Sequence, residues 1–249
     1  MWLVVGLGNP GKEYASHRHN VGFMAVDELL RATRGDSYRE KFSAEYARAS
    51  HAGEDLILLK PQTFMNLSGQ SVQPAAAFFK VPVERILVIH DELDVPFGEV
   101  RLKVGGGHAG HNGLRSMIDR LGAPSFARLR VGIGRPPAGF RGEVADYVLS
   151  SFDSSERAEL SDILGKTTQA ALDVFAHGLT AATNRLHAGK SDRRPTANDA
   201  RVASPPKARE ESKKTSGDAA SAADPKKQPE TPPRSGVENP GAASPRGKA

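Results

Sequence analysis

Residues 3–22 read LVVGLGNPGKEYASHRHNVG, and the rest of the chain is organised around them. The apolar run at residues 2–7 ends at a glycine, which is typical of a strand buried on both faces. From Asn20 onward, apolar residues recur at helical spacing, and Asn20 stands at the N-cap position. Between strand and helix, this segment brings an amide (Asn9) and an imidazole (His19) to one end of the strand.

The glycines allow a second interpretation, because residues 6–11 match the dinucleotide-binding pattern G-x-G-x-x-G after a strand. Two observations argue against it. Pro10 lacks the N–H that such a loop presents to a pyrophosphate. Residues 12–19 also look like a loop, where the motif requires a helix to begin at once. We therefore expect a tight turn that aims Asn9 at a substrate.

Strand-like and helix-like segments alternate along residues 1–190 and predict a single α/β domain. Further strands are expected at residues 42–50, 55–60, 85–90, 99–104 and 127–133. Helices are expected at residues 20–30, 68–79, 114–121, 152–177 and 180–187. The first two of these further strands form a predicted hairpin, so a mixed, twisted sheet flanked by helices is favoured over a purely parallel one.

Residues 191–249 differ in composition from the rest of the chain. They contain no aromatic residue, no Leu and no Ile, but nine of the 17 prolines. Such a segment cannot bury enough apolar surface to offset its ordering entropy, so the sequence predicts a disordered Pro/Lys/Ala-rich tail. The tail carries +4 of the chain's net +5, which leaves residues 1–190 nearly neutral. Weak attraction to RNA is one interpretation of this charge, and a linker without function is the other.

The chain has no cysteine, which excludes disulfides and thiol chemistry. The apolar run at residues 2–7 is too short for a signal peptide and lacks a basic n-region. No apolar run approaches the roughly 20 residues that a membrane-spanning helix needs. We therefore expect a cytoplasmic protein that does not contact a membrane.

Polar residues from distant parts of the sequence follow the predicted strands. Asn9 follows the first strand, Asp91 follows the strand at residues 85–90, and a glycine-rich loop covers residues 105–113. Ligands of α/β sheets bind outside the carboxyl ends of the strands, so these segments predict one active site. His19 titrates near neutral pH, and Asp91 can fix the tautomer of an imidazole by accepting its hydrogen bond.

Metal binding is another interpretation of the histidines. The pairs His17/His19, His90/Asp91 and His108/His111 have ligand-like spacings. No tight pattern such as HExxH is present, and two of these histidines lie in a glycine-rich loop. We therefore expect no metal.

Two predicted strands carry basic residues at alternate positions, Arg101 and Lys103 on one and Arg128 and Arg130 on the other. Alternate residues of a strand share a face of the sheet. This pattern predicts either a phosphate-binding surface on an otherwise neutral domain or a solvated outer face.

Seven sequence blocks carry a resemblance to a known family: VGLGNPGKEY, RHNVGF, KPQTFMNLSG, HDELDVPFG, KVGGGHAGHNGL, RLRVGIGRP and ATNRLH. With these blocks, in the family's order, the chain resembles bacterial-type peptidyl-tRNA hydrolases from residue 3 to about residue 187. The tail is not part of the resemblance.

The resemblance implies a phosphorylase/hydrolase-like α/β globule that acts as a monomer without a cofactor. Its substrate would be peptidyl-tRNA. Its reaction would be the hydrolysis of the ester between the peptide and the 3′-terminal ribose, which recycles tRNA from the peptidyl-tRNA that stalled ribosomes drop. By the same resemblance, His19 is the general base that activates water, Asp91 assists it, and Asn9 distinguishes peptidyl from aminoacyl substrate. The other implied residues are Tyr14, Phe64, Met65, Asn66, His111 and Asn112 around the site, and Lys103 and Arg130 for tRNA phosphate.

Two other function classes stay open at this point: an RNA-binding module without activity and a metal-dependent hydrolase. Turnover of N-acetyl-aminoacyl-tRNA tests the first alternative, and inactivation by a chelator tests the second.

Overall fold

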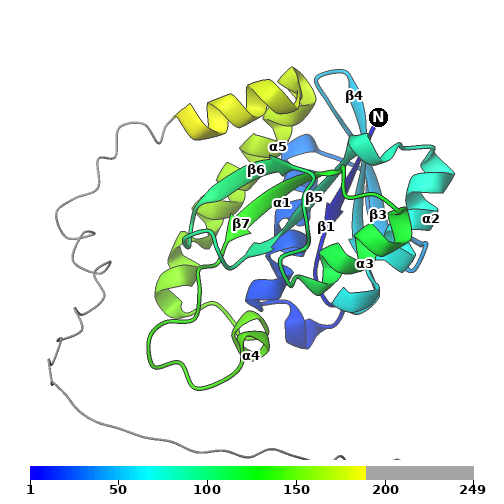
Figure 1. The fold of residues 1–249 in the computed structure, drawn as a ribbon. Helices are drawn as coiled ribbons and strands as arrows, with labels where there is room; N and C mark the ends of the chain where they lie inside the picture. Colours follow the sequence, from blue (N-terminus) through cyan, green and yellow to red (C-terminus); the bar gives the residue numbers. More distant parts are fainter. Residues whose placement is uncertain (189–249) are drawn as a thin grey trace, which may run out of the picture. The chain divides into compact units, whose positions relative to one another are not determined.

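The strands form one seven-stranded sheet with the order β2-β3-β4-β1-β5-β7-β6 (Figure 1). The structure is a computed structural model, and it describes residues 1–188. The strands are β1 (Trp2–Gly6), β2 (Arg39–Lys41), β3 (Ala44–His51), β4 (Glu54–Pro61), β5 (Ile86–Glu92), β6 (Val100–Val104) and β7 (Ala127–Gly132). The central strands β4, β1, β5 and β7 run parallel, whereas the strands at both edges pair antiparallel. The predicted α/β class and mixed sheet are confirmed.

Different helices cover the two faces of the sheet (Figure 1). The helices are α1 (Val21–Thr33), α2 (Gly69–Phe79), α3 (Asn112–Leu121), α4 (Val144–Val148) and α5 (Ser154–Ala188). Successive side chains of a strand point to opposite faces, so Val4 of β1 packs in one apolar core with residues of α1 and α5. Leu3 and Val5 pack in a second core with residues of α2 and α3. β1 is buried along its whole length, as its unbroken apolar run predicts.

The start of α1 lies directly against the ends of β1 and β5. A Cβ atom on Gly22 would lie 2.4 Å from the carbonyl oxygen of Ile89 and 2.5 Å from the backbone nitrogen of Leu7, so a glycine is required there. This close approach holds the 3₁₀ turn Arg18–Asn20, which directly precedes α1, near the carboxyl ends of the two central strands. The fold thereby places His19 at the predicted edge of the sheet.

The sequence does not predict β2 or α4. Helical periodicity is read over windows of about 11–18 residues, and α4 has only five residues. The strand β2 is shorter still, with three residues. Elements this short give no periodic signal. Three other 3₁₀ turns connect the larger elements: Lys12–Tyr14, Met65–Leu67 and Val83–Arg85.

The two helices predicted at residues 152–177 and 180–187 form one stretch, α5, which is broken at Gly178 (φ 80°, ψ 167°). Asn20 stands at the N-cap position of α1 as expected, but its side chain makes no capping hydrogen bond, and neither does that of Ser68 at the same position of α2. Ser68 Oγ instead donates to the carbonyl oxygen of Met65. The side chain of Asn20 binds the backbone of Asn9.

Within residues 1–188, no helix is both long and apolar enough to cross a membrane. The predicted tail at residues 191–249 lies outside the described residues.

Candidate active site

A cavity of about 640 Å³ opens at the carboxyl ends of β1 and β5. Its walls come from these two strand ends, the turn before α1, the turn after β4, the loop that leads into α3, and α4. Most predicted site residues line it, namely Asn9, His19, Phe64, Met65, Asn66, Asp91, His111 and Asn112. Tyr14, Lys103 and Arg130 do not line this cavity.

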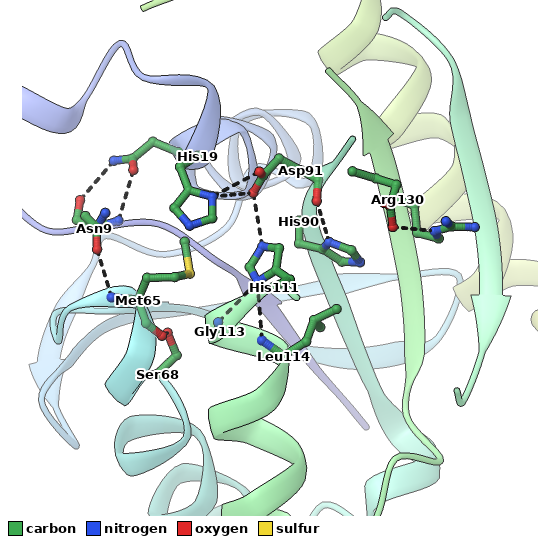
Figure 2. A network of polar contacts seen from close by, with 12 residues as sticks. Asn9, His19, Met65, Ser68, His90, Asp91, His111, Gly113, Leu114 and Arg130 are labelled. Carbon is green, nitrogen blue, oxygen red and sulfur yellow. Dashed lines mark hydrogen bonds and ion pairs between the residues drawn. The ribbon is translucent and has the colours of Figure 1, made fainter. Parts of the chain in front are cut away.

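His19 and Asp91 are directly hydrogen-bonded (Figure 2). Nδ1 of His19 lies 2.8 Å from Oδ1 and 2.9 Å from Oδ2 of Asp91, and both residues are buried, with 9% and 4% of their surface exposed. A carboxylate only accepts hydrogen bonds, so Nδ1 carries the proton and Nε2 of a neutral His19 keeps its lone pair. This is the tautomer that a general base needs.

The electrostatics of the pair agree with this assignment. Burial lowers the pKa of His19, but the charge and hydrogen bond of Asp91 raise it more, so the pKa lies above its ordinary value of 6.5. Burial raises the pKa of Asp91, but His19 and His111 together hold it well below the ordinary range. Asp91 is therefore ionised at neutral pH and stabilises a proton on His19.

His111 is held in one tautomer by two sets of contacts. Its Nδ1 accepts hydrogen bonds from the backbone N–H groups of Gly113 (3.1 Å) and Leu114 (3.4 Å), and thereby caps α3. Its Nε2 lies 3.1 Å from Oδ1 of Asp91 and must be the donor there. The side chain therefore links the first turn of α3 to the carboxylate of the site (Figure 2).

Nitrogen and oxygen atoms of His19, Asp91 and His111 lie within 4.8 Å of one another, which is compatible with a metal site by distance alone. The hydrogen-bonding pattern does not fit a metal, however. Nδ1 of His111 accepts two backbone hydrogen bonds and its Nε2 donates to Asp91. Neither ring nitrogen of His111 offers a lone pair to an ion in this arrangement.

His90 lies under the site and is 1% exposed. Its Nδ1 donates to the carbonyl oxygen of Asp91 over 2.7 Å, which steadies the backbone of that residue. Burial, and to a lesser extent the neighbouring His111, lower the pKa of His90 to about 3, although Asp91 acts in the other direction. His90 is therefore neutral and adds no charge beside Asp91.

The amide of Asn9 has a fixed orientation. Its Oδ1 accepts the backbone N–H of Met65 over 2.8 Å, so its Nδ2 is left as a hydrogen-bond donor. The backbone of Asn9 is held in turn by Asn20, whose side chain accepts from its N–H and donates to its carbonyl oxygen, both over 2.9 Å. Asn20 does not stand out from the sequence as a site residue, because an N-cap role accounts for an asparagine at a helix start equally well.

The turn after β4 and the start of α3 supply exposed groups to the cavity. Phe64 is 57% exposed, and Met65 beneath it is buried. Asn66 and Asn112 are exposed residues that line the cavity, and Oδ1 of Asn112 accepts a hydrogen bond from Arg115 over 2.8 Å. An aromatic ring and free amide groups are suited to stacking and hydrogen bonding with a nucleotide.

The basic residues of β6 and β7 have different environments. Nε of Arg130 binds Glu92 over 2.9 Å, and Arg101 binds Glu99 over 3.0 Å. Arg128 is buried and donates to the carbonyl oxygens of Gly106 and Gly107, so it supports the glycine-rich loop. Lys103 is exposed and has no ion pair among residues 1–188. Of the four, Lys103 is therefore the cation most available to an external phosphate.

Tyr14 lies outside the cavity, with its ring edge-on to His17 at 5.4 Å between centroids. The sequence pattern does not predict the apolar wall that α4 forms. Val144, Val148 and Leu149 line the cavity, together with Leu93 after β5. One signal could have revealed α4: Glu143 and Asp146 form a reciprocal capping box at its start.

Comparisons with known proteins agree along the described chain. Residues 3–195 match a family described as "Peptidyl-tRNA hydrolase". A protein of that name from Sorangium cellulosum is 66% identical over 184 residues, which cover 74% of this chain and 82% of that protein. Another, from Bdellovibrio bacteriovorus, is 45% identical over 187 residues, which cover 75% of this chain and all of that protein. The crystal structure of peptidyl-tRNA hydrolase from Acinetobacter baumannii has a TM-score of 0.70 and 40% identity, and the match covers 76% of this chain and 95% of that one.

Proposed function

The chain belongs to the peptidyl-tRNA hydrolase family, and we propose that it hydrolyses the ester between a peptide and the 3′-terminal ribose of tRNA with His19 as general base. One observation carries the mechanism: Asp91 binds the protonated Nδ1 of His19 within the cavity. Nε2 is thereby left to take a proton from water. A positioned base of this kind contributes about 10²–10⁴-fold to the rate.

Water attacks the ester carbonyl while His19 accepts its proton, and the resulting imidazolium is stabilised by ionised Asp91. Negative charge develops on the carbonyl oxygen, and the free Nδ2 of Asn9 is a suitable donor to it or to the peptide backbone. Collapse of the intermediate expels the ribose oxygen, which recovers a proton from His19. The ester is reactive enough that water can attack it directly, and the mechanism uses no covalent enzyme intermediate.

For substrate binding, we place the terminal adenosine of the CCA end against Phe64, with Asn66 and Asn112 as hydrogen-bonding partners. His111 fixes the loop over the site through its bonds to Asp91 and α3. Lys103 holds tRNA phosphate, and Arg130 joins it by exchanging Glu92 for a phosphate. Tyr14 flanks the entrance on the other side. The enzyme acts as a monomer in the cytoplasm, where ribosomes release peptidyl-tRNA.

The decisive experiment is turnover of N-acetyl-aminoacyl-tRNA by the wild type and by His19→Ala. We expect hydrolysis by the wild type, a loss of at least about 10²-fold in the variant, and unchanged tRNA binding in both. His177→Ala, at an exposed position of α5, is the matched control and keeps full activity. Near-normal hydrolysis by His19→Ala would refute the mechanism. A wild type that binds tRNA without turnover would indicate an RNA-binding module. Inactivation of the wild type by a chelator would indicate a metal-dependent enzyme.

A further inference from the structure

The residue directly before His19 is a buried arginine that the mechanism does not use. Arg18 is 6% exposed and lies in the same 3₁₀ turn, Arg18–Asn20. Its Nη1 donates to Oγ of Ser150 and to the carbonyl oxygen of Ser151, both over 2.6 Å. Its Nη2 forms an ion pair with Glu156. All these partners follow α4 or begin α5, more than 130 residues further along the chain.

Glu156 has two functions at once. Its Oε2 binds Arg18 and also accepts the backbone N–H of Asp153 over 2.8 Å, while Oδ1 of Asp153 accepts the N–H of Glu156 over 2.9 Å. This reciprocal pair satisfies backbone N–H groups at the N-terminus of α5. The guanidinium of Arg18 therefore binds a carboxylate that is itself hydrogen-bonded to the backbone at the start of α5.

The backbone makes the same connection. The N–H of Arg18 donates to the carbonyl oxygen of Ser150 over 3.0 Å, and His17 forms an isolated antiparallel bridge with Ser151. The hydroxyl groups of Ser16 and Ser151 are also hydrogen-bonded, over 2.8 Å, so residues 16–18 and residues 150–151 are joined by both backbone and side chains.

The guanidinium also contacts α4 itself. It lies 4.5 Å from the ring centroid of Tyr147 and 5.5 Å from that of Phe152. Tyr147 is buried, and its hydroxyl donates to the carbonyl oxygen of Ile133 over 2.8 Å. Other residues of the same short helix, Val144 and Val148, line the active-site cavity. A change at Arg18 therefore acts on both His19 and the apolar wall.

We infer that Arg18 is a positioning residue for the reaction. It fixes His19 relative to the apolar wall of α4, so that the base lies at the correct position for the bound substrate. The inference rests on the proposed function. A buried ion pair contributes little net stability over an apolar replacement, because desolvation offsets the attraction. The ion pair can nevertheless fix residues 16–18 and residues 150–151 in one relative position. Catalysis is sensitive to such positioning, since displacements of about 1 Å can lower a rate about 10²-fold.

A second cavity, of about 450 Å³, gives access to Arg18 from outside the active site. Arg18, Tyr147 and Glu156 line it, and so does Arg135, which is exposed and paired with Asp94. Nε of Arg18 is buried and has no hydrogen-bond partner among the described residues. If the side chain is shortened, a small guanidinium ion can therefore enter this cavity and occupy the vacated position.

The test measures kcat and KM for N-acetyl-aminoacyl-tRNA in Arg18→Lys and Arg18→Ala. We expect kcat to fall about tenfold or more in Arg18→Ala and less in Arg18→Lys, with KM changed by less than about twofold, because no tRNA contact is removed. Millimolar guanidinium should restore kcat in Arg18→Ala, whereas His19→Ala should not respond. Arg135→Ala, in the same cavity, is the matched control and keeps wild-type kcat and KM.

The folded fraction of each variant is measured by thermal unfolding, and kcat is expressed per folded molecule. Wild-type kcat per folded molecule, a loss confined to KM, or a loss that guanidinium leaves unchanged would each overturn the inference. If Arg18→Ala does not fold, Arg18→Lys and Glu156→Gln carry the same test, and a normal kcat in both overturns it. A wild-type enzyme without turnover would refute the proposed function instead.

Discussion

His19 and His111 share one hydrogen-bond acceptor, the Oδ1 atom of Asp91, over 2.8 and 3.1 Å respectively. Their rings lie 4.9 Å apart between centroids. Because His19 donates through Nδ1 and His111 through Nε2, only His19 keeps an unused ring nitrogen, Nε2, while Nδ1 of His111 accepts hydrogen bonds from the start of α3. The carboxylate is thus oriented from two sides before any substrate arrives.

The two functions of His111 can be separated by substitution. In His111→Asn, the side-chain oxygen can still cap α3, but the donor to Asp91 is lost. We expect kcat to fall while the free energy of unfolding stays near the wild-type value. His111→Ala loses the cap as well and should be less stable than His111→Asn by about 0.5–2 kcal/mol. Urea denaturation and single-turnover kinetics measure both quantities, and equal stability of the two variants would argue against the capping role.

Asp91→Asn should change both the rate and its pH dependence. In the wild type, the rate should rise with pH through the pKa of His19, which lies above 6.5 because Asp91 outweighs the effect of burial. Without the carboxylate, only the lowering effect of burial is left, so the rising limb should move to lower pH. An introduced amide can also donate to Nδ1 and select the wrong tautomer, so the plateau should fall about 10²-fold or more. Asp94→Asn, at an exposed carboxylate, is the control, and an unchanged pH profile in Asp91→Asn would disprove the pairing.

Asn9→Asp should isolate the donor function of Asn9. An aspartate oxygen can still accept the N–H of Met65, so the fold should be retained. The Nδ2 donor is lost, however, and a negative charge appears where the reaction develops one. We expect kcat to fall about 10²–10³-fold, as when an oxyanion donor is removed. Asn9→Ala loses the acceptor for Met65 too and should be measurably less stable. Full activity of the aspartate variant would exclude Asn9 from transition-state binding.

Lys103→Glu should weaken tRNA binding and flatten its dependence on salt. A lost phosphate contact lowers the slope of log K against log salt by about one. The variant should hydrolyse a small ester substrate at the wild-type rate, because Lys103 lies outside the active-site cavity. Lys166→Glu, at an exposed position of α5 on the other face of the sheet, controls for the change in net charge. An equal loss on both substrates would refute the phosphate role.

Much of the fold is predictable because its central strands are short apolar runs with clear ends. β1 and β5 are buried almost throughout, and a polar residue at the end of each, Asn9 or Asp91, identifies the functional edge. The side chains of His19 and Asp91 lie together as expected, because strand β5 and the turn before α1 end at that edge. Local patterns were sufficient for these features.

The remaining features depend on contacts that leave no periodic signal. Arg18 reads as an ordinary surface arginine in the sequence, and its burial becomes visible only when Glu156 is placed beside it. Asn20 reads as a helix cap, yet it binds the backbone of Asn9. Arg130 reads as a free cation, yet Glu92 lies 2.9 Å away. In each case the partner is more than ten residues away in the sequence. The local sequence is compatible with more than one role for each residue, and only the tertiary structure shows which partner it binds.

The position of α4 near the end of the domain has a consequence for synthesis. Asn9 and His19 leave the ribosome first, but the apolar wall at Val144 to Leu149 and the partners of Arg18 emerge more than 120 residues later. A nascent chain is itself attached to tRNA by the bond that this enzyme cleaves. While it is being made, the chain holds the proposed base and lacks the wall, so we expect its hydrolytic capacity to arise only as translation of the domain is completed.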